Sequence, residues 1–376
     1  MKKNFISIFT ILPIIWILSF TSFGQIRSLE YLFKSGTDGY QTFRIPAIIT
    51  TTGGNIIAFA EGRKNGSSDT GDIDLVMKKS SDNGKTWSEL KVLRDDGDNV
   101  CGNPAPVVDR ISGTIYLLST WNLGEDHESE IINQTSTDTR RIFVMESSDE
   151  GNSWSLPKEI TSSVKQENWT WYATGPCHGI QIKNDKFRDR LIIPCDHIEA
   201  GTKKYFSHII YSDDHGKSWQ IGGSTPQDQV NECAIAELPE GNLMLNMRNY
   251  DRSKKTRKIS LSEDGGLTWG NIYPDKSLVE PICQASLLRY SFAESGISRI
   301  LFSNPANKEK RENMTLRISY DEGSTWEKSI VLFSGPSAFS DLTRLPNDNI
   351  GCLFEAGINN PYEGIVYREV NLTDIE

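Results

Sequence analysis

Arginines recur in this sequence next to the ends of apolar, strand-like runs. Arg44 and Arg63 lie at the outer ends of two such runs, Arg248 lies at the end of another, and Arg311 lies in a polar loop between two runs. A single arginine near a strand end is normally solvated or paired with a carboxylate. Four that converge on one surface repel each other unless an anion compensates, and the guanidinium fork suits a carboxylate or a phosphate.

Two carboxylates accompany these arginines. Glu232 stands before Cys233 at the start of an apolar run, where it would be partly buried and would need a cation. Arg248 is the nearest cation that the pattern offers. Asp69 lies in the polar segment 66–72, where its ordinary role would be to form a turn. Beside a bound anion, these two residues are candidates for acid and base catalysis.

A repeated octet, S-x-D-x-G-x-[ST]-W, indicates the elements that position these residues. It begins at residues 80, 147, 212, 262 and 319. The Asp can accept backbone N–H bonds within a turn, the Gly supplies a positive φ, and the Trp buries a large apolar surface. Five copies that begin 50 to 67 residues apart indicate an internal repeat of the kind found in propellers and arrays.

Six β-hairpins are predicted around the octets. They span residues 43–63, 103–121, 178–197, 232–248, 284–304 and 339–355. An octet follows each of the first five, so a hairpin, a third strand, the octet turn and a fourth strand form one four-stranded antiparallel blade. The chain ends, 27–33 and 364–371, complete the sixth blade. We therefore predict an all-β fold, a single six-bladed β-propeller over residues 25–376.

This topology gathers the candidate residues on one rim. If the octet turns lie at the bottom, the open ends of the inner hairpins lie at the top, around the central axis. Pairing Thr50 with Asn55 would set Arg44 opposite Glu61. Phe339, at the start of the sixth hairpin, would lie on the same rim.

The fourth hairpin adds Glu232 to this rim. Pairing Leu238 with Leu243 would bring Glu232 within one residue of facing Arg248. Two longer top segments, 122–141 and 162–176, are expected to wall a pocket, and Trp171 and Tyr172 lie in the second.

Residues 1–24 have the composition of an export signal. Lys2 and Lys3 precede a hydrophobic run over 5–20, and small residues, Ser22 and Gly24, follow at the positions that a signal peptidase reads. We expect a periplasmic or secreted protein with no stable membrane insertion after cleavage.

Composition excludes some classes of partner. The net charge of −10 argues against nucleic acid, which proteins bind with a basic surface. The five histidines show no ligand spacing, so no metal and no cofactor is predicted. The six cysteines could pair in an exported chain or remain as buried thiols.

The segment Phe43-Arg44-Ile45-Pro46, followed by the repeated octets, resembles the bacterial and animal sialidases (neuraminidases) from about Thr42 to Tyr367. The resemblance implies an exo-α-sialidase that removes terminal sialic acids from glycans or glycoproteins without a metal. The roles it implies are a carboxylate clamp of Arg44, Arg248 and Arg311, a further substrate contact at Arg63, a general acid at Asp69 and a general base at Glu232.

One position departs from the family pattern. Sialidases use a neutral tyrosine nucleophile, since the carboxylate of the sugar would repel an anionic one. Its stretch is Ser-x-Tyr-Ser-Asp-Leu, whereas residues 337–342 here read Ser-Ala-Phe-Ser-Asp-Leu and place Phe339 in the tyrosine position. Tyr362 belongs to a different stretch of the family pattern and is no substitute.

Three interpretations follow from Phe339. The protein is a sialidase with altered or weakened chemistry, a sialic-acid-binding propeller without turnover, or a glycosidase that uses direct water attack on a related keto-sugar acid.

Overall fold

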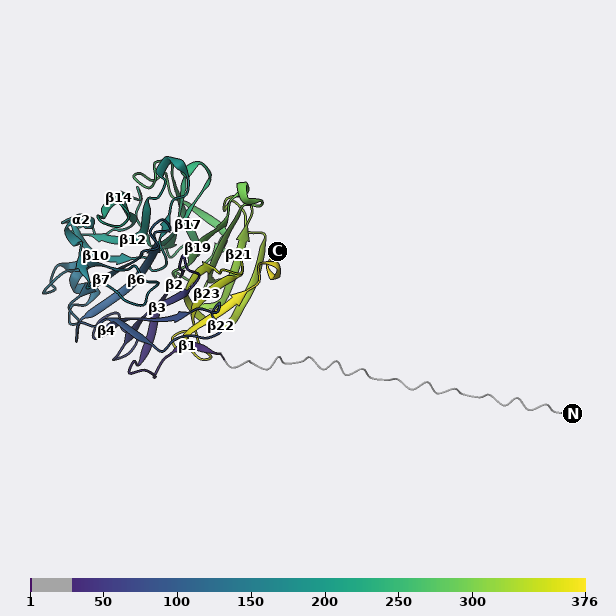
Figure 1. The fold of residues 1–376 in the computed structure, drawn as a ribbon, viewed down its shortest axis with the longest axis horizontal. Helices are drawn as coiled ribbons and strands as arrows, with labels where there is room; N and C mark the ends of the chain where they lie inside the picture. The colour runs from purple at the N-terminus through teal and green to yellow at the C-terminus, as the bar shows by residue number, and fades with distance from the viewer. Residues whose placement is uncertain (2–28) are drawn as a thin grey trace.

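The structure is a computed structural model that describes Met1 and residues 29–376, and its regular secondary structure is almost wholly β-strand (Figure 1). The all-β prediction is therefore confirmed. Apart from Met1, the predicted export segment 1–24 lies outside the described residues. Helical structure in the described part of the chain is short: α1 (Glu128–Asn133), α2 (Thr161–Val164) and four 3₁₀ turns. None of these helices is long and apolar enough to cross a membrane.

The strands form four sheets. The first contains β2 (Thr42–Thr50), β3 (Ile56–Arg63), β4 (Ile73–Ser80), β5 (Lys91–Arg94), β6 (Val100–Val108), β7 (Ile115–Asn122), β8 (Arg141–Ser147) and β9 (Lys158–Glu159). The second contains β10 (Trp169–Thr174), β11 (Ile180–Gln181), β12 (Leu191–Glu199), β13 (Tyr205–Ser212) and β14 (Gln220–Ser224). The third contains β15 (Val230–Glu237), β16 (Leu243–Asn249), β17 (Thr256–Ser262) and β18 (Tyr273–Val279). The fourth contains β19 (Ser286–Ser291), β20 (Arg299–Pro305), β21 (Glu312–Ser319), β22 (Lys328–Arg344), β23 (Ile350–Ala356), β24 (Gly364–Val370) and β1 (Tyr31–Lys34).

The two largest sheets each join two four-stranded groups. In the first sheet, β4 and β6 are linked by one parallel residue pair, Ile73 with Val100, whereas the other pairings are antiparallel. In the fourth, the first part of the long strand β22 pairs with β21 and its second part pairs with β23. The end of the chain meets its beginning there, since β24 pairs with β1 as predicted.

Inner strands contact each other in sequence order. β2 contacts β6, β6 contacts β12, β12 contacts β15, β15 contacts β19, β19 contacts β22, and β22 contacts β2. Figure 1 shows this last contact as the yellow C-terminal strands beside the purple and blue N-terminal ones. The ends of these strands surround the site described below.

Five of the six predicted hairpins form, two of them with a shifted register at the turn, and the third does not form as predicted. In that segment β11 pairs with only the first residues of β12, and β10 pairs with the rest of it. The predicted hairpin over 178–197 is therefore wrong in its first strand, which is split in two. Pro176 stands between the two pieces and has no N–H to give to a sheet, which accounts for the break.

The open end of the first hairpin has the predicted register, in which Arg44 pairs with Glu61. At the turn end, Thr50 pairs with Ile56 and not with Asn55 as expected. A β-bulge just after Arg44 shifts the register back by one residue. Arg44 therefore pairs with Glu61 as predicted, although the register at the turn was predicted wrongly.

The fourth hairpin is also shifted at its turn. Glu237, and not Leu238, pairs with Leu243, and this register brings Glu232 beside Arg248.

Apolar side chains fill the space between neighbouring strand groups. Octet tryptophans take part in this packing: the Trp154 ring lies edge-on to Phe59, with ring centroids 5.9 Å apart, and Trp219 lies edge-on to Tyr116 at 6.1 Å. Each pair joins an octet to the strand group before it. All six cysteines are buried free thiols, so the structure holds no disulfide among them.

Candidate active site

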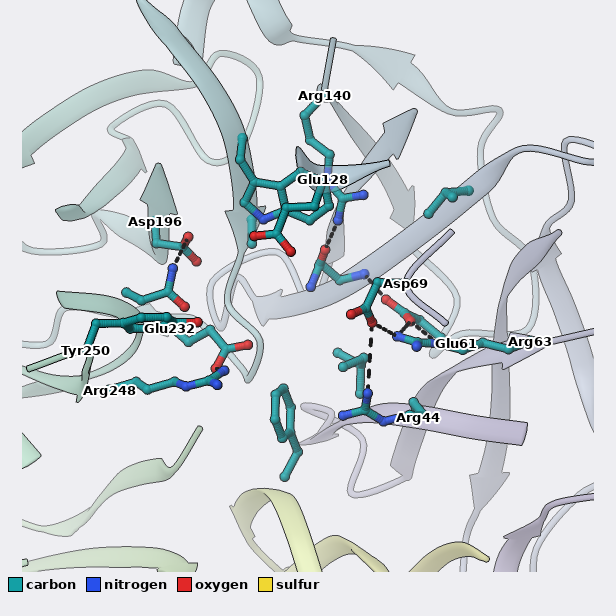
Figure 2. A pocket seen from close by; sticks show the side chains of 17 residues that line it. Arg44, Glu61, Arg63, Asp69, Glu128, Arg140, Asp196, Glu232, Arg248 and Tyr250 are labelled. Carbon is teal, nitrogen blue, oxygen red and sulfur yellow. Dashed lines mark hydrogen bonds and ion pairs between the residues drawn. The ribbon is translucent and has the colours of Figure 1, made fainter. Parts of the chain in front are cut away.

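A cavity of about 100 Å³ opens where the inner strands end (Figure 2). Its walls are unusually rich in charge for a chain of this composition. The lining residues are Arg44, Ile45, Glu61, Arg63, Asp69, Val100, Asn103, Glu128, Arg140, Trp171, Ala173, Asp196, Asn231, Glu232, Arg248, Tyr250 and Phe339. Six of the seven residues proposed from the sequence are among them, and Arg311 is not.

Arg63 shapes the loop that presents Asp69. Its Nε donates to Glu61 Oε2 at 2.9 Å, and its Nη1 donates to the carbonyl oxygens of Ser67 and Ser68 at 2.6 and 2.8 Å. Its Nη2 lies 2.7 Å from Asp69 Oδ1. With its donors engaged in this way, Arg63 holds the segment between β3 and β4 in place and leaves Asp69 facing the cavity.

Asp69 is the most accessible charged group of the site, with 58% of its side chain exposed. A second arginine, Arg44, approaches it to 3.9 Å. Burial by the walls raises the pKa of Asp69, but the charges of Arg63 and Arg44 outweigh that effect and hold its pKa below the usual value. In the unliganded site Asp69 is therefore a carboxylate.

Arg44 is buried and held by a carboxylate from the far end of the chain. Its Nε donates to Glu355 Oε1 at 3.0 Å, and the backbone N–H of Ile45 donates to the same oxygen at 3.0 Å. The guanidinium also lies over two rings, with 5.2 Å to the centroid of Phe339 and 4.3 Å to that of Tyr362. Burial lowers the pKa of Arg44, but Glu355 more than offsets this and raises it.

Glu232 and Arg248 form an ion pair across the strands β15 and β16. Arg248 Nη1 donates to Glu232 Oε2 at 2.6 Å, and each side chain is 13% exposed. The Nε of Arg248 is buried without a hydrogen-bond partner among the described residues, and the Tyr250 ring lies 5.0 Å from the guanidinium. Although burial lowers the pKa of Arg248, Glu232 raises it overall.

Arg311 does not line the cavity, but it lies beside Phe339, which does. Its guanidinium is 5.8 Å from the centroid of Phe339, and its Nη1 donates to Tyr362 Oη at 2.8 Å. The ring of Phe339 therefore lies within cation–π range of both Arg44 and Arg311. The phenol hydroxyl that contacts Arg311 belongs to Tyr362, which the sequence analysis did not assign to the site.

Sequence reasoning missed most of the upper wall, which carries Glu128 from α1 and Arg140 (Figure 2). The guanidinium of Arg140 is 4.0 Å from the Trp171 ring, and its Nε donates to the carbonyl of Tyr172 at 3.1 Å. No carboxylate pairs with Arg140 in the described chain, and burial lowers its pKa to about 10. Burial and the charge of Asp69 raise the pKa of Glu128.

The predicted wall segments were a partial signal for these residues. Glu128 and Arg140 lie in the segment 122–141, and Trp171 lies in 162–176, but their charges were not singled out. Tyr172 points away from the cavity and is fully buried in the core. Asp196 was also missed, although an acidic residue inside the apolar run of β12 is itself an unusual pattern.

The cavity thus offers cations for an anionic group, and among its carboxylates Asp69 is accessible and Glu232 is partly buried beside Arg248. Such a set can bind a small acid and exchange protons with it. Among the described residues, no group of three or more His, Cys, Asp and Glu side chains is placed to hold a metal ion.

A family model described as a BNR repeat-like domain matches residues 54–353. The chain is 32% identical to an exo-alpha-sialidase of Aspergillus fumigatus, over 89% of this chain and 85% of that protein. It is 31% identical to a sialidase of Micromonospora viridifaciens and 29% identical to one of Bacteroides fragilis, over 91% of this chain in both cases. It spans 53% and 64% of the lengths of these two bacterial relatives, respectively.

Solved structures agree with the sequence relatives. A Hadza microbial sialidase superposes with a TM-score of 0.83 at 29% identity, covering 93% of this chain and 70% of that one. A leech intramolecular trans-sialidase complexed with 2,7-anhydro-Neu5Ac superposes with a TM-score of 0.77 at 19% identity, covering 94% of this chain and 71% of that one. The second likeness concerns the fold alone.

Proposed function

Since the chain belongs to the BNR-repeat family of sialidases, we propose that it is an exo-α-sialidase that removes terminal sialic acids from glycans or glycoproteins. One observation carries the proposal: Arg44, Arg248, Asp69 and Glu232 line the same small cavity. These are the charges that a substrate with a carboxylate and a scissile glycosidic bond at one carbon atom requires.

Arg44 and Arg248 bind the sugar carboxylate in this proposal. Arg44 is buried and Arg248 is partly buried; both are positively charged, and each keeps N–H donors beyond those used by Glu355 and Glu232. Arg311 lies beside Phe339 without lining the cavity, and from there its charge stabilises the bound anion. A fixed array of this kind orients the substrate and offsets its charge before reaction.

Asp69 protonates the leaving oxygen. Its pKa in the unliganded site is held low by Arg63 and Arg44, which is unfavourable for an acid. A substrate carboxylate at Arg44 would neutralise part of that charge and raise the pKa of Asp69. Substrate binding would thereby favour the protonated form of Asp69, which is the form that can donate a proton to the leaving oxygen.

Glu232 acts as the general base, and Phe339 determines what it acts on. Phe339 has no hydroxyl, so Glu232 activates a water molecule at the position where a tyrosine oxygen would lie. This route forms no covalent glycosyl-enzyme and is slower than one with a tyrosine nucleophile. Phe339 also favours a second candidate function, a sialic-acid-binding protein with negligible turnover.

Two assays test the proposal. Purified protein should release the fluorophore from a fluorogenic α-sialoside, and calorimetry should detect binding of the sialic acid product. Binding without release would favour the second candidate. Release from a related keto-sugar acid but not from sialosides would instead favour a glycosidase for that sugar. If the protein neither releases a sugar from any of these compounds nor binds sialic acid, the proposal is refuted.

We also propose that the six four-stranded groups close into a six-bladed propeller. The cyclic contacts of the inner strands and the pairing of β1 with β24 support this arrangement. A crystal structure with a gap between β22 and β2 would contradict it.

Export of the protein is a further proposal and rests on residues 1–24 alone. Cleavage after Gly24 should leave a chain that begins at Gln25, and intact mass measurement of protein recovered from the periplasm or the medium would test it. A chain that retains these residues inside the cell would contradict export.

A further inference from the structure

One wall of the cavity carries a buried carboxylate that the proposed reaction does not use. Asp196 on β12 is 1% exposed and lines the cavity. Its Oδ2 accepts a hydrogen bond from Asn231 Nδ2 at 2.7 Å. Its Oδ1 is buried and has no hydrogen-bond partner among the described residues. Figure 2 shows Asp196 across the cavity from Arg44 and Asp69.

A buried oxygen without a hydrogen-bond partner destabilises the fold. Because Asp196 Oδ1 lies at a cavity wall, a ligand bound in the cavity is a suitable source of the missing donor. Burial raises the pKa of Asp196, and the nearby charges of Glu232 and Glu128 raise it further, although Arg248 and Arg140 oppose them. A neutral carboxyl group both donates and accepts a hydrogen bond. A hydroxyl group does the same, which makes it a suitable partner.

The proposed orientation of the substrate indicates which hydroxyl groups can reach this wall. The carboxylate and the scissile oxygen of a sialic acid are both bonded to its anomeric carbon, C2. With the carboxylate at Arg44 and the oxygen at Asp69, the part of the sugar remote from C2 faces the opposite wall. That part bears the ring hydroxyl, the C5 substituent and the hydroxylated tail.

We propose that Asp196 is a specificity-determining residue that hydrogen-bonds one hydroxyl on the part of the sugar remote from C2. The inference rests on the proposed function, because it uses the placement of the carboxylate. Its consequence is that acidic sugars lacking this hydroxyl are poor substrates even when their carboxylate and glycosidic bond are intact.

The test pairs deletion of the enzyme group with deletion of single substrate groups. The substrates are a fluorogenic sialoside and its analogues that lack the hydroxyl at C4, C7, C8 or C9. For the parent protein, one of these deletions should lower kcat/KM by at least about tenfold. For Asp196→Ala, the same deletion should cost less than about twofold, while the other deletions cost the same in both proteins.

Asp126 provides a matched control. It is 3% exposed and lies outside the cavity lining, and its two oxygens accept the backbone N–H groups of Thr137 and Asp138 at 2.8 and 2.9 Å. Asp126→Asn neutralises a satisfied buried carboxylate and should leave the pattern of deletions unchanged. Asp196→Asn keeps the shape of the side chain and serves if Asp196→Ala does not fold, as judged by thermal melting.

The outcomes separate the inference from the proposed function. Turnover of the unmodified sialoside by the parent supports the proposed function whatever Asp196 does. If every deletion then costs the same in the parent and in the Asp196 variants, the specificity role is refuted. If the parent turns over none of the substrates, the same cycle is measured by calorimetric binding of the free sugars. Absence of binding as well would refute both proposals.

Discussion

Aspartates occur both in the octet turns and in the cavity described above, here called the rim cavity, but their hydrogen bonding differs between the two places. In the first octet, Asp82 accepts hydrogen bonds from Ser80 Oγ at 2.8 Å and from the backbone N and Oγ1 of Thr86 at 2.9 and 2.6 Å. The N–H of Gly84 donates to Ser80 Oγ at 2.9 Å. The other four octets repeat the hydrogen bonds of their Ser, Asp, Gly and final Ser or Thr.

The rim cavity leaves its polar groups partly unsatisfied. Arg44 finds Glu355 far along the chain, and Arg248 pairs with Glu232 from a neighbouring strand. Arg248 Nε and Asp196 Oδ1 are buried without a hydrogen-bond partner in the part of the chain that the structure describes. Each octet carboxylate is occupied by hydrogen bonds inside its own turn, where it stabilises that turn. Asp69 instead pairs with Arg63 but keeps 58% of its side chain exposed at the cavity, where it is available to a ligand.

The largest expected effect tests the functional side of this comparison. Asp69→Asn should lower kcat/KM for a natural sialoside by at least about 100-fold, because the leaving oxygen loses its proton donor. A 4-nitrophenyl sialoside needs little protonation and should lose less than about tenfold. Steady-state rates on both substrates are the measurement. Equal losses on both substrates would assign Asp69 a positioning role through Arg63. Asp69 would then be a structural aspartate like those of the octets.

The same contrast explains how much of the molecule could be predicted from sequence. The octets and five hairpins depend on neighbours in the chain, and their residue types are sufficient to identify them. The position of Arg311 beside Phe339 but off the cavity lining, and the split between β10 and β11, depend on packing between distant strands, which a local pattern does not encode. Asp196 and Arg140 were missed for the same reason, since their environment is defined by residues from other strands.

A second prediction compares two arginines that sequence reasoning treated alike. Arg248→Lys removes the planar fork from the cavity wall and should weaken binding of sialic acid by about 2 kcal/mol, or about 30-fold. Arg311→Lys should cost less, because Arg311 does not line the cavity. Calorimetric titration of both variants is the measurement. Unchanged affinity in both would refute the carboxylate clamp, and an equal large loss would show that Arg311 contacts the ligand directly.

A third prediction concerns the missing hydroxyl. Phe339→Tyr should raise turnover by at least about tenfold, a barrier change of about 1.4 kcal/mol, since it restores a neutral nucleophile between Arg44 and Arg311. It should also permit covalent trapping by a fluorinated sialoside, as detected by intact mass.

Tyr362→Phe is the matched control, because it removes the other phenol hydroxyl near Arg311. Turnover by the parent should survive this change. If the parent already forms a covalent adduct and Tyr362→Phe abolishes it, Tyr362 is the nucleophile and the assignment of Phe339 is wrong.

The smallest expected effect tests the structural side of the comparison. In the octet at Ser147, hydrogen bonds from the Oγ and backbone N–H of Ser153 lower the pKa of Asp149 to about 2, from 3.8. Between these two pH values the unfolded chain binds more protons than the folded one, so the stabilisation by Asp149 is complete above about pH 4 and is lost as the pH falls toward 2.

Asp149→Ala should therefore lower the urea midpoint at about pH 6, and the difference from the parent should shrink at about pH 3. Asp98→Ala is the control, since that side chain is exposed and makes no hydrogen bond to the described residues. It should leave the midpoint unchanged at both pH values. Substrate affinity of folded Asp149→Ala should equal that of the parent, because the octet closes its own bonds away from the cavity. A gap that stays constant with pH, or a selective loss of binding, would show that this aspartate does not act as the local turn that its sequence predicts.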